Sequence, residues 1–219
     1  NFNFKDIDLI EEKFDFIIGD LGVSSMQIDD PKRGFTFKFD APLDLRMNPN
    51  EGVPASEKIK YMTEDELIGM LQENADEPYA KQIAREIIKT RQQGLPIEST
   101  KDLHEVIKRA LVFIHKQDFD NTVKKSSQRT FQALRIDVNE EYEVLYELLD
   151  KIPNLLKKDG KVAILTFHSG EDRLVKKSFK QFYNQGLYKE NIGPIQPTLD
   201  EISTNSRSRS AKLRCAIKS

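Results

Sequence analysis

The stretch that decides the fold is Phe14-Asp15-Phe16-Ile17-Ile18-Gly19-Asp20, and a small polar loop at residues 21–27 follows it. A short apolar run bounded by turn residues is typical of a strand buried on both faces, as in a parallel sheet. In open α/β sheets the ligand crevice lies at the carboxyl ends of such strands, where Asp20 stands. Its carboxylate can accept hydrogen bonds from a ligand hydroxyl, ammonium or amine. An ordinary turn or helix cap at Asp20 is the alternative interpretation.

Composition narrows the class of protein. A chain of 219 residues is long enough for one domain with a sizeable insertion. The 34 Lys and Arg residues nearly balance the 36 Asp and Glu residues, so any contact with a polyanion must come from local patches. The single cysteine excludes an internal disulfide and a cysteine-rich metal site. No apolar stretch approaches membrane-spanning length and no secretory signal is visible, so we expect a cytoplasmic protein without a membrane partner.

The middle of the chain, residues 51–125, is predicted to be an all-helical insertion. Thr63-Glu64-Asp65-Glu66 is a capping box, and Ser99-Thr100 caps a further helix. Tyr79, Ile83 and Ile87 recur at helical spacing, which favours a core stripe over a binding face. The connector at residues 29–52 is rich in Pro and Gly but also carries phenylalanines, so we expect an ordered loop.

The second half of the chain returns to an α/β pattern. We predict one helix over residues 127–152, ended by Pro153, and then a buried strand over 161–167. A basic amphipathic helix follows, residues 186–206 have the composition of a loop, and residues 212–218 form a terminal strand. This order is typical of the second half of a doubly wound sheet. If the strands ending at Asp20 and before His168 are parallel neighbours, their polar clusters face one crevice.

Each polar cluster also admits a simpler interpretation. His168-Ser169 lacks the glycine-flanked serine elbow of hydrolases, and no histidine pair has metal-ligand spacing. The alternative for His168 is a purely structural role. The alternative for Glu171-Asp172-Arg173 is an ordinary helix start, with acids near the positive end of the helix dipole. The basic run at residues 205–214 suits phosphate contacts, because guanidinium groups bind phosphate oxygens in pairs, but a solvated tail is the alternative.

Read together, these clusters resemble the family of small-subunit rRNA cytosine-N4-methyltransferases called RsmH or MraW. The matching segments occur in the right order and span nearly the whole chain. They are Asp20-Leu21-Gly22-Val23-Ser24-Ser25-Met26-Gln27-Ile28-Asp29-Asp30, Arg33-Gly34-Phe35-Thr36-Phe37, Pro42-Leu43-Asp44-Leu45-Arg46-Met47, Arg129-Thr130-Phe131-Gln132-Ala133-Leu134-Arg135-Ile136-Asp137-Val138-Asn139, Phe167-His168-Ser169-Gly170-Glu171-Asp172-Arg173 and Arg207-Ser208-Arg209-Ser210-Ala211-Lys212-Leu213-Arg214.

The resemblance implies a fold, a cofactor and a substrate. The fold would be a Rossmann-like methyltransferase domain over residues 1–50 and 126–219, with the insertion at 51–125 used in substrate recognition. The cofactor would be S-adenosylmethionine. The substrate would be a cytidine in the decoding region of small-subunit rRNA, free or in the 30S subunit. The sequence leaves the oligomeric state open, a homodimer included.

The resemblance also implies roles for individual residues. Asp20 and Gln27 would contact the cofactor, and Phe4 would lie against its adenine, although Asn1-Phe2 repeats the same dipeptide. The catalytic candidates are Asp20, His168 and Ser169, the last two for orienting the base. The residues expected to bind substrate are Arg46, Arg129, Arg135, Arg173, Asn205, Arg207 and Arg209.

The sequence departs from the family pattern in several places. The chain begins at Asn1 rather than Met, and the glycine-rich loop and the acid that belong to the amino-terminal part of the family domain are not found. We therefore expect an N-terminally incomplete domain with weak or absent cofactor binding. The usual His-Pro is Lys125-Ser126, the usual Leu after His-Ser is Gly170, and the usual Asn-Pro-Arg is Asn205-Ser206-Arg207. The rival interpretation is a catalytically silent rRNA-binding protein of ribosome assembly.

Overall fold

The computed structural model describes residues 3–219, apart from the side chains of Ser25 and Asp29, and divides into two compact units. The sheet unit comprises Asn1–Gly22 and Tyr142–Ser219, and the helical unit comprises Val23–Glu141. The α/β fold class is confirmed. The helical unit contains the whole predicted insertion, residues 51–125, together with the connector before it. The assignment of that insertion as a substrate-recognition domain stays a prediction.

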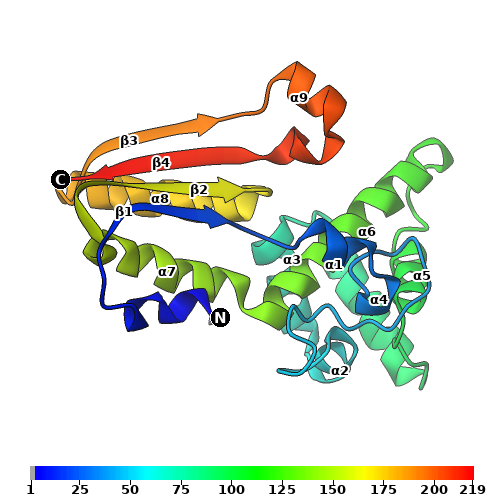
Figure 1. Cartoon of the computed structure of the whole chain (residues 1–219). Helices are drawn as coiled ribbons and strands as arrows, with labels where there is room; N and C mark the ends of the chain where they lie inside the picture. The colour runs from blue at the N-terminus through cyan, green and yellow to red at the C-terminus, as the bar shows by residue number, and fades with distance from the viewer. Residues whose placement is uncertain (1–2) are drawn as a thin grey trace. The chain divides into compact units, whose positions relative to one another are not determined.

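The described part of the sheet unit contains one four-stranded mixed sheet (Figure 1). Its strands are β1 (Phe14–Asp20), β2 (Leu156–Thr166), β3 (Tyr188–Ile195) and β4 (Lys212–Lys218). Its helices are η1 (Phe4–Leu9), α7 (Glu141–Leu155), α8 (Ser169–Asn184), α9 (Leu199–Thr204) and η3 (Ser206–Ser210). The spatial order is β1-β2-β4-β3, with β1 parallel to β2 and β4 antiparallel to both of its neighbours.

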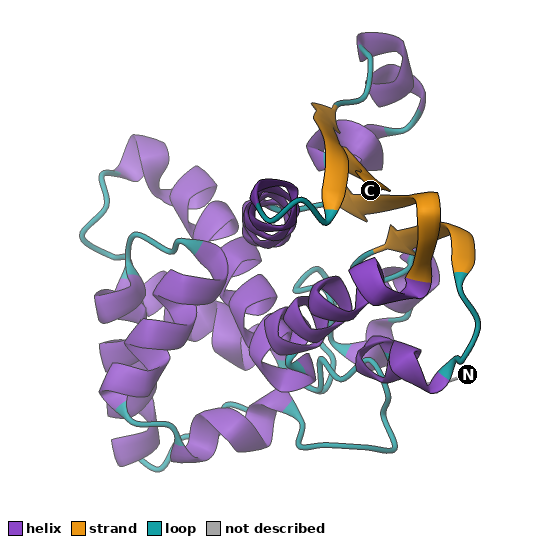
Figure 2. Ribbon diagram, turned by 90° about the vertical axis from the view of Figure 1, so that its left-hand side faces the viewer, coloured by secondary structure: helices purple, strands orange, loops and turns teal. Residues whose placement is uncertain are grey.

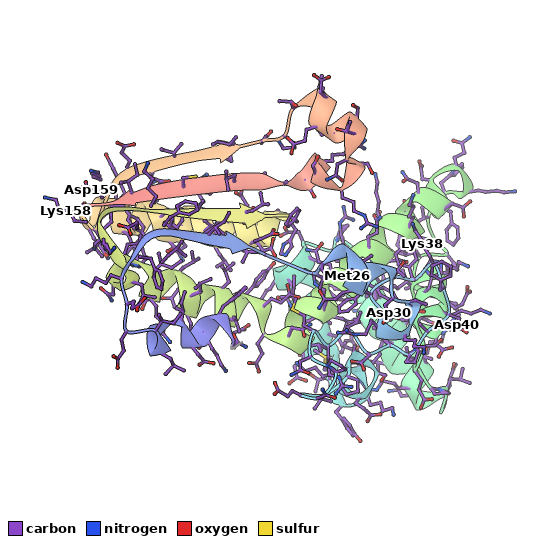
Figure 3. The ribbon with its side chains drawn as sticks, in the orientation of Figure 1. Met26, Asp30, Lys38, Asp40, Lys158 and Asp159 are labelled. Carbon is purple, nitrogen blue, oxygen red and sulfur yellow. The ribbon has the colours of Figure 1, made fainter. Side chains whose placement is uncertain are left out.

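The register fixes which ends of the strands meet. Asp20 is opposite Leu165, so the carboxyl ends of β1 and β2 lie side by side, as predicted. Lys158 and Asp159 lie at the other end of the sheet, near the start of β2 (Figure 3). The strands are drawn in orange in Figure 2.

Three predictions of local structure are wrong. The helix predicted over 127–152 is two helices, because Glu140 has a left-handed φ of 51° that ends α6 (Lys116–Asn139) before α7 begins. Pro153, predicted to end the helix, lies inside the last turn of α7. Residues 186–206, predicted as loop, contain β3 and α9. Only Tyr188 of β3 is buried, so this edge strand shows no apolar alternation that would reveal it.

Strand β1 is less buried than predicted. Helices α7 and α8 contribute to a single apolar core together with Val162, Ile164 and Ala216, so they cover the same face of the sheet. On the other face, the exposed fractions of Phe16 and Ile18 are 54% and 67%. Burial on both faces is therefore wrong for β1 within residues 3–219.

Tyr188 lies in this core with an unpartnered hydroxyl. The residue is 1% exposed, and its ring meets Phe179 and Phe182 edge-on at centroid distances of 5.6 and 5.8 Å. No residue of the described chain hydrogen-bonds to its hydroxyl, and burial raises the pKa of Tyr188. A buried polar group without a partner is destabilising.

We therefore expect Tyr188→Phe to leave the free energy of unfolding unchanged or to raise it by up to about 1 kcal/mol, because the ring packing is kept and only the unpaired hydroxyl is removed. Urea denaturation followed by circular dichroism checks this, with Tyr188→Leu as the control that removes the ring and lowers stability. A loss of more than about 1 kcal/mol in Tyr188→Phe would mean that the hydroxyl has a partner after all.

The helical unit contains no strand among its described residues. Its elements are α1 (Ser25–Asp29), η2 (Pro31–Arg33), α2 (Ala55–Tyr61), α3 (Glu64–Ala75), α4 (Ala80–Gln92), α5 (Thr100–Ala110) and α6. The capping box of Thr63 with Glu66 and the cap at Ser99 are confirmed. Ile83 and Ile87 are buried in the core of this unit, as their spacing predicts. No helix within residues 3–219 is both long and apolar enough to cross a membrane.

The connector at residues 29–52 is ordered, as predicted. Leu43 and Leu45 are fully buried in the helical core, and the backbone of Leu43 donates to the carbonyl of Glu98 at 2.8 Å. The Arg33 guanidinium donates to the carbonyls of Arg46 and Met47, at 2.8 and 2.7 Å. These bonds between distant points of the connector explain how a long segment whose regular structure is little more than η2 is held in place.

Candidate functional site

The structure brings two predicted site residues to one edge of the sheet. β1 ends at Asp20 and β2 ends at Thr166, directly before Phe167 and His168. The backbone N–H of Leu21 donates to Leu165 at 3.1 Å, which continues the pairing to the tips of both strands. A methyl group added at Gly22 would lie 3.9 Å from Oε1 of Glu171, so the loop after β1 begins beside the start of α8. This parallel pairing is the arrangement in which open sheets bind ligands.

Among the described side chains, the Asp20 carboxylate is a free acceptor at this edge. Asp20 is exposed, and within residues 3–219 no hydrogen bond or ion pair occupies its side chain. The alternative of a helix cap does not apply, because Ser24 is the N-cap of α1. A free carboxylate at a strand end fits a ligand that presents hydroxyl, ammonium or amine donors.

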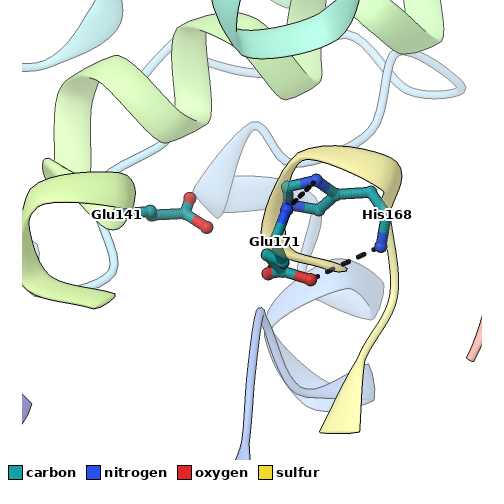
Figure 4. A group of neighbouring side chains, drawn as sticks. All are labelled: Glu141, His168 and Glu171. Carbon is teal, nitrogen blue, oxygen red and sulfur yellow. Dashed lines mark hydrogen bonds and ion pairs between the residues drawn. The ribbon is translucent and has the colours of Figure 1, made fainter. Parts of the chain in front are cut away.

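His168 is the N-cap of α8. Its Nδ1 accepts the backbone N–H of Glu171 at 3.4 Å, and Oε2 of Glu171 accepts the backbone N–H of His168 at 3.4 Å (Figure 4). Its Nε2 lies 3.1 Å from Oε1 of Glu171 but has no hydrogen-bond partner among the described residues. The imidazole therefore has a structural role, and its ring is held in one orientation at the edge of the sheet.

Asp172 forms a buried ion-pair cluster that the sequence did not indicate. Its carboxylate accepts from Nε of Arg214 at 2.7 Å and from Nη2 at 3.3 Å, while Nζ of Lys212 lies at 3.2 Å. Arg214 is only 6% exposed. Burial alone would raise the pKa of Asp172, but the hydrogen bonds from Arg214 and Lys212 outweigh it and hold the pKa below its usual value of 3.8. This cluster fixes the first turn of α8 to β4.

Gly170 and Tyr142 share one space next to His168. A Cβ at position 170 would lie 1.8 Å from the Tyr142 hydroxyl oxygen, which no real contact allows. The Tyr142 ring also lies 6.0 Å from the His168 ring, centroid to centroid. The glycine therefore makes room for a phenol that packs beside the capping histidine. Ser169 is exposed at the first position of α8.

Four predicted site residues belong to the helical unit, where each has a structural contact. Oε1 of Gln27 accepts the backbone N–H of Ser24 at 2.8 Å in the capping box of α1. The other three contact carboxylates of the same unit: Arg46 binds Asp44 through two nitrogens, at 2.7 and 2.8 Å, Arg135 binds Glu141 at 2.8 and 3.0 Å, and Arg129 lies 3.8 Å from Glu77. Their contacts with cofactor or RNA stay predictions.

The remaining predicted residues belong to the sheet unit. Phe4 opens η1 with a 50% exposed side chain, while its alternative Phe2 lies outside the described residues. The side chain of Asn205 caps η3, which carries Arg207 and Arg209 as exposed residues before β4. Arg173 is exposed on α8. The basic tail is therefore an ordered turn.

The class is an α/β domain in which an exposed carboxylate and a fixed imidazole stand at neighbouring strand ends, the position where open sheets bind ligands. The chain belongs to the MraW methylase family, whose model matches residues 2–219. The predicted family and its methyltransferase fold class are thereby confirmed.

Curated relatives are similar over nearly the whole chain. Ribosomal RNA small subunit methyltransferase H 2 of Acholeplasma laidlawii is 61% identical over 99% of this chain and 63% of its own length. Ribosomal RNA small subunit methyltransferase H 1 of Lachnoclostridium phytofermentans is 54% identical over 99% of this chain and 60% of its own length. Ribosomal RNA small subunit methyltransferase H of Prochlorococcus marinus is 44% identical over 98% of this chain and 69% of its own length. The chain thus spans about three fifths of the length of the first two relatives.

Proposed function

We propose that this chain forms part of an S-adenosylmethionine-dependent methyltransferase that methylates N4 of a cytidine in the decoding region of small-subunit rRNA, in the cytoplasm. Family membership and the names of the relatives support the reaction class and the rRNA substrate. The observation that carries the proposal is the free Asp20 carboxylate next to the end of β2. That carboxylate would hold a hydroxyl or the ammonium group of the cofactor.

Methylating the exocyclic amine of cytosine is difficult because its lone pair is delocalised into the ring. Bound S-adenosylmethionine supplies an electrophilic methyl group, and alignment of the reacting atoms contributes about 7–11 kcal/mol of barrier reduction. We assign orientation of the base to His168 and Ser169, at the start of α8. His168 is poorly placed to accept the amine proton, because its Nδ1 already accepts the N–H of Glu171. The target base must be unstacked to reach such a site.

Asp20→Ala in the complete gene product that contains these residues is expected to lower methyl transfer to small-subunit rRNA about 10–100-fold, since it removes hydrogen bonds to a charged acceptor. Incorporation of radiolabelled methyl groups measures this. The matched control is Asp15→Ala near the start of β1, where the carboxylate is 83% exposed and pairs with Lys157. The thermal midpoint should stay the same in both variants. Full activity of Asp20→Ala would count against the assigned role.

The second candidate function is a catalytically silent rRNA-binding protein. It is favoured by the structural roles of His168, Glu171 and Asp172, which need no substrate to explain them. Calorimetric titration with S-adenosylmethionine separates the two functions. Absence of binding by the complete gene product would favour the silent protein, whereas saturable binding that Asp20→Ala weakens would favour the enzyme.

A further inference from the structure

Helix α8 carries a row of basic side chains that are exposed to solvent. Arg173, Lys176, Lys177 and Lys180 are all exposed, and they follow one another at spacings of three, four and seven residues from the first. Residues at these spacings lie on one face of an α-helix. We call these four residues the α8 basic face. The opposite side of the helix is apolar, with Val175, Phe179 and Phe182 buried in the core of the sheet unit.

The three lysines of the α8 basic face have no acid beside them. Glu171 and Asp172 are the only acids of α8, and both are buried, one in the helix cap and the other against Arg214. Among the described side chains, no carboxylate lies within 4.0 Å of the Lys176, Lys177 or Lys180 ammonium groups.

Helix electrostatics do not account for these charges. Bases stabilise the last turn of a helix, where the dipole is negative, but the last turn of α8 contains none. The three lysines instead repel one another, because like charges three and four residues apart destabilise a helix. A bound polyanion would relieve that repulsion. The net charge of the whole chain is −2, so this attraction is local rather than global.

We propose that the α8 basic face binds the phosphate backbone of the substrate RNA beside the target nucleotide. This inference rests on the proposed function. The helix begins directly after His168, so the row of basic side chains leads away from the candidate site along the helix axis. With a rise of about 1.5 Å per residue, it places four positive charges within about 10 Å. Flexible ammonium groups contact phosphates as point charges, which fixes the position of the RNA without reading its sequence.

The test replaces the three lysines together, as Lys176→Gln, Lys177→Gln and Lys180→Gln, and measures RNA affinity by fluorescence anisotropy over a range of salt concentrations. The probes are a decoding-region rRNA stem–loop transcript and an unrelated transcript of the same length. We expect affinity at about 0.1 M salt to fall about tenfold or more on both probes. The slope of log affinity against log salt should become less steep by about 2 to 3, because each lysine that binds a phosphate contributes about one to that slope.

Two further variants make the outcome decisive. Lys13→Gln, Lys158→Gln and Lys161→Gln remove the same charge from exposed lysines outside α8 and should leave affinity and slope unchanged. Lys176→Arg, Lys177→Arg and Lys180→Arg keep the charge and should keep the affinity. An unchanged slope in the α8 glutamine variant, an equal loss in the control, or no RNA binding by the wild type overturns the proposal. If the wild type does not prefer the decoding-region probe, the proposed substrate fails while the α8 result still stands.

Discussion

Replacing Asp172 by alanine is expected to lower the free energy of unfolding by about 3–5 kcal/mol. The variant leaves the Arg214 guanidinium, 6% exposed, without the carboxylate that accepts from it at 2.7 Å. Removing one partner of a buried ion pair is costly because the remaining charge is neither hydrated nor neutralised. Lys212 is less affected, because its side chain is 33% exposed and can be hydrated. Chemical denaturation of the wild type and of Asp172→Ala measures the difference in the free energy of unfolding.

The control is a double variant, Asp172→Leu with Arg214→Met, which removes both charges and should recover most of the loss. Measuring the same stability difference at acidic pH provides a second control. The folded pKa of Asp172 is below its unfolded value, so its contribution is complete above about pH 4 and is lost as the pH falls through the folded pKa. The difference between wild type and Asp172→Ala should therefore shrink in acid. A double variant as unstable as the single one would contradict the explanation.

Gly34→Ala is expected to destabilise the protein by about 2–5 kcal/mol. The residue has a φ of 71°, and a left-handed backbone costs an alanine about 1–2 kcal/mol. The added Cβ would also lie 2.4 Å from the carbonyl oxygen of Pro42 and 3.2 Å from the backbone nitrogen of Asp44. Backbone atoms cannot rotate away, so the connector must shift, at a cost of about 1–3 kcal/mol. Thermal and urea denaturation measure the effect.

Gly94→Ala is a matched control for Gly34→Ala. Its φ is also 71°, but a Cβ there has no atom within 4 Å. It should therefore show only the backbone contribution of about 1–2 kcal/mol, and the difference between the two variants reports the overlap with the connector. Equal losses in both variants would show that the overlap is relieved without cost.

The sequence predicts the elements whose pattern is local. The apolar runs that end at Asp20 and before His168 indicated two strands and their parallel pairing, and the caps at Thr63 and Ser99 indicated two helix starts. The break at Glu140 escaped detection because the apolar stripe continues in register from α6 into α7. Strand β3 was missed because an exposed edge strand needs no apolar alternation.

The candidate site is harder to predict because its contacts join distant residues. Asp172 and Arg214 are separated by 42 positions, and nothing in the local sequence links a helix-start acid to an arginine in a strand. The sequence alone left both a structural and a substrate-orienting role open for His168. The position of the Glu171 backbone N–H relative to the ring shows that the imidazole caps α8. The sequence likewise does not show that the side chains of Arg46 and Arg135 bind carboxylates of the same unit, so both arginines were predicted to bind substrate.

The shared space of Gly170 and Tyr142 makes these positions evolutionarily interdependent. A larger residue at 170 becomes tolerable only after the phenol at 142 has shrunk or turned away, so the order in which the two changes occur matters. Substitutions acceptable at either site in a homologue are thus not freely transferable into this background, and grafting one of them alone would disturb the histidine that begins α8.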